Sequence, residues 1–137
     1  MLKILLSLRF SWDQRVIEDL DDVQDFLHPK LKNLLPDPFL LLGMQDAITR
    51  IAKAIKKNEK VVIYGDYDVD GATSCALFKN YFSQIGIDVG IYIPDRISEG
   101  YGPNKDAFTK LTNLGYKLCI TVDCGILSHQ EIDHANI

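Results

Sequence analysis

From residue 60 onward, short β-branched runs alternate with longer stretches that have helical periodicity. The apolar runs cover residues 61–65, 88–93 and 118–122, and helical patterns cover residues 72–85, 103–114 and 128–137. Gly86 and Gly115 stand where the first two helices should end, because glycine accepts the left-handed conformation at a helix C-terminus. Strands that alternate with helices favour a parallel sheet. We therefore predict an α/β fold, a parallel-sheet βαβαβα unit over residues 60–137.

A short helical segment is predicted before this unit, over residues 1–59. Residues 12–27 and 45–57 carry apolar side chains at helical spacing. The first helix should end before Pro29, since the residue preceding a proline is pushed out of the α region. Residues 31–38 contain Pro36 and Pro38 and are expected to form a loop or short turn. The apolar start, residues 1–8, is too short to span a membrane.

The first apolar run ends in aspartates at alternate positions, Asp66, Asp68 and Asp70, followed by Gly71. Like charges this close raise one another's pKa, so such a cluster suggests a cation among the carboxylates. Hard oxygen ligands suit Mg²⁺, Ca²⁺ or Mn²⁺. The competing interpretation is a solvated acidic loop that caps the next helix. One aspartate is enough for a cap, and the presence of three favours a metal site at the end of a strand.

Two common loop types fit this string poorly. An EF-hand needs a glutamate at its twelfth position, where this chain has Leu77, and it needs a helix before the loop. A P-loop ends in Gly-Lys-Ser/Thr, whereas this turn ends in Gly71-Ala72-Thr73 without a lysine. A phosphorelay receiver domain, which also carries acids after its first strand and an aspartate after its third, stays open as a less favoured alternative.

Asp123 follows the third apolar run directly. In an open α/β sheet, ligands bind outside the carboxyl ends of the strands. If the first and third strands are neighbours, Asp66, Asp68, Asp70 and Asp123 converge on one site. Two metal ions about 3.5–4 Å apart could share such carboxylates and promote displacement at a phosphate ester. The prediction is a two-metal site for divalent cations that prefer oxygen ligands.

A glycine-rich stretch after the second run should lie on the same edge of the sheet. In it, Arg96 is suited to phosphate oxygens and Tyr101 to stacking on a base. Gly100 and Gly102 permit backbone conformations that other residues resist. The stretch is equally consistent with a plain loop closed by an Arg96–Glu99 ion pair.

The composition limits the partners. Net charge is −4, so the chain as a whole carries no electrostatic signature of nucleic-acid binding, and any such binding must be local. The 3 cysteines form no Cys-x-x-Cys pair, and their odd number argues for reduced thiols and a cytoplasmic location without a membrane. Cys119 and Cys124 are expected to be small buried residues.

Three motifs together resemble one family. They are Gly-Asp-Tyr-Asp-Val-Asp-Gly at 65–71, the Ile-Pro-Asp-Arg stretch with Glu-Gly-Tyr-Gly at 93–102, and Val-Asp-Cys-Gly at 122–125. They closely resemble the RecJ-type single-strand-specific DNA exonucleases of the DHH phosphoesterase superfamily. The resemblance implies that residues 60–137 are a partial DHH phosphoesterase domain. It also implies a Mn²⁺- or Mg²⁺-dependent hydrolase that removes nucleotides from the 5′ end of single-stranded DNA in repair and recombination.

Roles for individual residues follow from the resemblance. Asp68, Asp70 and Asp123 are implied to be catalytic metal ligands, with Asp66 a ligand or a partner of the ligands. Residues near the substrate are then Arg96, Glu99, Gly100, Tyr101 and Gly102.

The family's Asp-His-His motif is missing, since Asp133-His134 is followed by Ala135. We therefore expect a fragment that binds metal weakly and hydrolyses little unless a C-terminal part or another chain completes the site. The remaining alternatives are a phosphodiesterase for short oligonucleotides and a non-catalytic remnant or binding module of the same fold.

Overall fold

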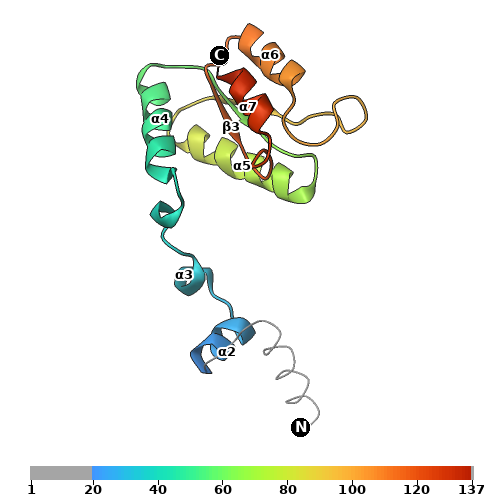
Figure 1. Ribbon diagram of the computed structural model, residues 1–137. Coiled ribbons are helices and arrows are strands. Elements are labelled where there is room, and N and C mark those ends of the chain that lie inside the picture. The colour runs from blue at the N-terminus through green and yellow to red at the C-terminus, as the bar shows by residue number, and fades with distance from the viewer. Residues whose placement is uncertain (1–19, 137) are drawn as a thin grey trace. The chain divides into compact units, whose positions relative to one another are not determined.

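The computed structural model describes residues 20–136. The chain forms two compact units that divide between Met44 and Gln45, and each is described separately (Figure 1). The predicted division lay later, between residues 59 and 60. The second unit begins earlier because helix α4 (Met44–Lys56) places Ala54 in its core, where the residue has no exposed surface. None of the helices within residues 20–136 combines the length and apolarity needed to cross a membrane.

The first unit contains short helices. Helix α2 (Leu20–Leu27) ends just before His28-Pro29, as predicted; residues 12–19 of the predicted helix and the apolar residues 1–8 lie outside the described residues. Residues 31–38 were expected to form a loop or short turn, and the structure has two short turns of helix in this region. Helix α3 (Leu31–Leu34) and the 3-10 turn η1 (Pro38–Leu40) form there. Proline is accepted at the start of η1, because the first N–H of a helix needs no partner.

The second unit is built on a three-stranded parallel sheet in the order β2-β1-β3. Strands β1 (Val61–Tyr64), β2 (Val89–Tyr92) and β3 (Leu118–Thr121) confirm the three predicted runs. Val61 is in register with Val89 on one side and with Leu118 on the other. Strands β1 and β3 are therefore neighbours, which was the condition for the predicted convergence of carboxylates.

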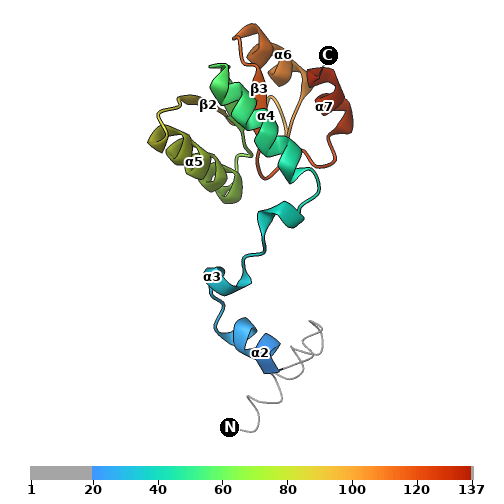
Figure 2. The same cartoon turned by 90° about the vertical axis from the view of Figure 1, so that its left-hand side faces the viewer.

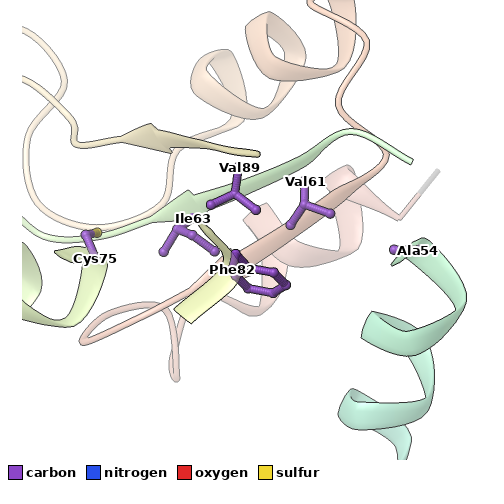
Figure 3. Close-up of a cluster of buried hydrophobic side chains, with 6 residues drawn as sticks. All are labelled: Ala54, Val61, Ile63, Cys75, Phe82 and Val89. Carbon is purple, nitrogen blue, oxygen red and sulfur yellow. The ribbon is translucent and has the colours of Figure 1, made fainter. Parts of the chain in front are cut away.

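Both faces of β1 are buried, which accounts for its unbroken apolar sequence. On one face, Val61 and Ile63 pack with residues of α4 and α5 (Val69–Gln84), and Figure 3 shows Phe82 of α5 pointing at this cluster. On the other face, Val62 and Tyr64 pack against α6 (Lys105–Asn113). Figure 2 shows the helices arranged around the sheet. The α/β fold class is confirmed.

Helix ends follow their local sequence. Gly86 and Gly115 have φ of +76° and +86°, as expected of glycines that end a helix. Helix α5 starts at Val69, earlier than predicted, because Asp68 is its N-cap. Leu77 and Tyr81 were predicted to be available for burial, but they are 70% and 60% exposed. The narrow sheet covers only one side of α5.

Beside each outer strand of the sheet, a cationic side chain donates a hydrogen bond to a backbone carbonyl. Lys79 Nζ donates to the carbonyl of Val89 at 2.6 Å, beside β2. Arg50 Nη2 donates to the carbonyl of Lys117 at 2.8 Å, beside β3. Such charged side chains discourage unwanted pairing at an open sheet edge. The last helix, α7 (His129–Ala135), packs against α6, and Ser128 precedes it as predicted.

Candidate metal centre

The turn from β1 into α5 holds the aspartate cluster. Asp66 is buried, at 1% exposure, and its Oδ1 accepts the N–H of Tyr67 at 2.7 Å. Asp68 Oδ1 accepts the N–H of Gly71 at 2.9 Å and so caps the helix. The predicted capping role is therefore present, but Asp68 alone fulfils it. Asp70 lies in the first turn of α5, where a negative charge suits the helix dipole.

Gly71 is required by close packing of the backbone. A Cβ at this position would lie 2.6 Å from the backbone nitrogen of Asp66 and 2.7 Å from its carbonyl carbon. Real carbon atoms do not approach so closely. The turn is therefore folded tightly on itself, and this holds Asp66 and Asp68 in place.

Asp123 joins the cluster from β3. It is exposed and has a φ of +59°, a left-handed conformation that aspartate tolerates better than most residues. The pKa of Asp123 is raised, first by desolvation and then by the charges of Asp68 and Asp70. Because β1 and β3 are neighbouring parallel strands, the aspartates that follow them lie at the same edge of the sheet, and the charges of Asp68 and Asp70 act on Asp123.

The cluster has uncompensated negative charge. Within residues 20–136 the ion pairs are Arg50–Glu59 and Lys79–Asp88, and neither involves the aspartates of the cluster. These carboxylates suit a divalent cation by charge and by ligand chemistry. However, over the same described range no three His, Cys, Asp or Glu side chains are arranged to hold one ion together. The residues fit a metal in kind, and the described part of the chain presents an incomplete ligand set.

The glycine-rich loop lies against this cluster. The ring of Tyr101 meets the ring of Tyr67 edge-on at 6.2 Å, and the guanidinium of Arg96 lies 5.3 Å from the centre of the Tyr67 ring. The pKa of Tyr101 is raised by desolvation and then by the charges of Asp66 and Asp123. Arg96 and Tyr101 are both exposed. The structure therefore brings these two predicted substrate residues to the same edge of the sheet as the aspartates.

The remaining predicted loop residues serve the shape of the loop. Gly100 and Gly102 have φ of +78° and +75°, so glycine is favoured at both positions. The alternative of an Arg96–Glu99 ion pair is wrong. Glu99 instead accepts hydrogen bonds from the hydroxyl of Tyr92 and, at 2.8 Å, from the N–H of Asp95.

Sequence reasoning missed two buried or half-buried tyrosines, Tyr64 and Tyr92, that end β1 and β2 and bond to this loop. Their position at a strand end was the available signal. Cys119 and Cys124 are half-buried, which corrects the expectation of full burial. Desolvation nevertheless raises the pKa of Cys119 to about 12 and that of Cys124 to about 11.

The model of the DHH family, N-terminal domain, matches residues 60–137. The chain belongs to the DHH family. Its relatives include the single-stranded-DNA-specific exonuclease RecJ of Bacillus subtilis (strain 168), which is 42% identical over 118 residues, or 86% of this chain and 15% of that protein. The RecJ of Dickeya dadantii (strain 3937) is 35% identical over 130 residues, covering 94% of this chain and 22% of that protein.

Solved structures of RecJ share the fold. The crystal structure of exonuclease RecJ bound to manganese superimposes with a TM-score of 0.61 at 34% identity, over 67% of this chain and 24% of the other. The crystal structure of RecJ in complex with Mn²⁺ from Thermus thermophilus gives a TM-score of 0.61 at 26% identity, over 90% of this chain and 16% of the other. The chain thus spans less than a quarter of the length of these relatives.

Proposed function

We propose that this chain supplies the first half of the metal site of a RecJ-type exonuclease specific for single-stranded DNA, acting from the 5′ end in DNA repair and recombination. The proposal is supported by the placement of Asp66, Asp68, Asp70 and Asp123 after the carboxyl ends of two adjacent parallel strands, without a lysine or arginine paired to them in the described residues. The similarity to RecJ proteins supports the choice of reaction.

The chain's own residues have distinct tasks in this proposal. Asp68 would hold a Mn²⁺ or Mg²⁺ ion while its Oδ1 keeps the cap on α5. Asp70 and Asp123 would be the other direct ligands, and Asp66, which is buried, would be a ligand or would orient the turn. Bound divalent ions would supply an activated water and neutralise charge on the phosphodiester. Arg96 and Tyr101 would meet the phosphate and the base of the DNA end.

The activity of the isolated chain is a separate matter. The described residues present no ready set of three ligands, so we expect weak Mn²⁺ binding, in the micromolar range or above, and little hydrolysis. Additional ligands from a C-terminal part or another chain would complete the site. Failure of the isolated chain to cut DNA is therefore consistent with the family assignment.

Calorimetric titration of the full chain with Mn²⁺ tests the metal site. Asp68→Asn keeps an oxygen that can cap α5 but removes the charge, so binding should weaken at least tenfold while the thermal midpoint stays nearly unchanged. Asp88→Asn is the matched control, because Asp88 is an exposed carboxylate paired with Lys79 outside the cluster. Equal Mn²⁺ affinity in the wild type and Asp68→Asn would contradict the proposed site.

A labelled single-stranded oligonucleotide incubated with the chain and Mn²⁺ tests the activity. Shortening from the 5′ end that is lost in Asp68→Asn would show that the present carboxylates suffice for cleavage. Metal binding without cleavage fits the incomplete site. If neither metal binding nor cleavage is found in a folded chain, a non-catalytic remnant of the fold becomes the better description.

A further inference from the structure

The loop of residues 95–102 carries Arg96 and Tyr101, and two tyrosines of the sheet are hydrogen-bonded to it. Tyr64 and Tyr92 are the last residues of β1 and β2 and are direct register partners in the sheet. Their rings lie 5.2 Å apart. Tyr64 has no exposed surface, so its hydroxyl must find partners within the protein.

Each tyrosine hydroxyl bonds to a different part of the loop. Tyr64 donates to the carbonyl of Gly102 at 2.9 Å, and its oxygen lies 3.5 Å from Nδ2 of Asn104, the N-cap of α6. Tyr92 donates to Oε1 of Glu99, whose Oε2 accepts the N–H of Asp95 at 2.8 Å. The two ends of the loop are thus tied to the ends of two adjacent strands.

Glu99 links the two strand-end contacts to the loop. Both of its oxygens accept hydrogen bonds from the protein, and the pKa of its carboxyl is lowered first by the bond from Tyr92 and then by the bond from Asp95. It therefore stays ionised at neutral pH. Both oxygens of this carboxylate are oriented by donors of the protein itself, which suits a residue that holds the loop in place.

We infer that Tyr64 and Tyr92 are positioning residues that hold Arg96 and Tyr101 beside the aspartate cluster, and that Glu99 is their acceptor and does not itself contact substrate. This inference rests on the proposed function in one respect only, namely that Arg96 and Tyr101 contact the substrate. The hydrogen bonds and the edge-on contact of Tyr101 with Tyr67 are made by the chain's own residues.

Limited trypsin digestion of the full chain tests this directly, since Arg96 is an exposed cleavage site in the loop. Loss of a charge-assisted hydrogen bond should increase the open population of the loop, and cleavage of a rapidly opening segment follows that population. Tyr92→Phe should therefore speed cleavage after Arg96 on the order of tenfold. Tyr81→Phe is the control, because Tyr81 is exposed on α5 and its hydroxyl has no hydrogen bond within the described residues.

Two further comparisons separate positioning from general stability. Cleavage after Lys57 and Lys117, which are exposed elsewhere in the same unit, should stay unchanged in Tyr92→Phe. In a Glu99→Ala background, Tyr92→Phe should have no added effect, because both changes remove the same bond. Uniform acceleration at all sites, additive effects, or no change after Arg96 would each overturn the inference. None of these readouts needs metal, DNA or activity, so they stand apart from the tests of the proposed function.

Discussion

Replacing Gly71 by alanine tests whether close backbone packing or helix propensity controls the aspartate turn. Gly71 lies in the first turn of α5, where alanine would ordinarily favour the helix by up to ~1 kcal/mol. In this structure the new Cβ would meet three backbone atoms of Asp66, with its nitrogen at 2.6 Å. A backbone cannot rotate away as a flexible side chain can, so the turn must open.

The expected loss follows from two contributions. Overpacking of this kind costs ~1–3 kcal/mol. Opening the turn also weakens the bond from the Gly71 N–H to Asp68, worth ~1 kcal/mol as a helix cap. Set against the gain in helix propensity, the net change is a destabilisation of ~1–3 kcal/mol. For a domain of this size, each ~1 kcal/mol lowers the thermal midpoint by roughly 4–8 °C.

Urea unfolding followed by far-ultraviolet circular dichroism measures the effect. The matched control is Ala72→Gly, the next residue, which is exposed and changes helix propensity in the opposite direction without a clash. We expect both variants to unfold at lower urea than the wild type. If Gly71→Ala instead raised the midpoint by about as much as Ala72→Gly lowered it, the packing argument would be refuted.

Three further predictions concern the core and the pH dependence. Phe82→Ala removes a side chain that is 1% exposed and should destabilise the unit by ~3–5 kcal/mol, measured by the same urea unfolding. The pKa of Asp123 is raised in the folded state, so its ionisation opposes folding above the unfolded pKa of about 4; Asp123→Asn should raise the thermal midpoint at pH 7 and change it little below pH ~4. The pKa of Asp88 is lowered by its bond from Lys79, so its contribution is present above pH ~4 and is lost on acidification. Lys79→Met should lower the midpoint at pH 7 and flatten its fall with acid, whereas a parallel fall in both proteins would contradict the assignment.

The sheet and its site edge were predictable because short-range chemistry determines both. The β-branched run at 61–64 predicts a strand buried on both faces, and an aspartate directly after a parallel strand has nowhere to lie except at the carboxyl edge. The sequence did not determine whether β1 and β3 are neighbours, and the structure shows that they are.

Other features depended on contacts between distant parts of the chain. The exposure of Leu77 and Tyr81 follows from the small number of strands beneath α5, which helical periodicity does not report. The role of Glu99 depended on the hydroxyl of Tyr92, which sequence patterns treat as one more aromatic residue in a strand. The short helix at residues 31–34 lies between prolines and has no side-chain cap at its start, so no local signal predicted it.

The central place of β1 has a consequence for how the chain folds during synthesis. Val61 pairs with Val89 and Leu118, so β1 is synthesised before either of the two strands with which it pairs. Every pairing in the sheet closes a long loop before it gains any hydrogen bonds, which makes folding slow compared with a helical bundle. During that interval an apolar segment with free N–H and C=O groups stays open to other chains. We therefore expect the strand that later carries the aspartate turn to be open to association in the nascent chain until β2 and β3 have been made.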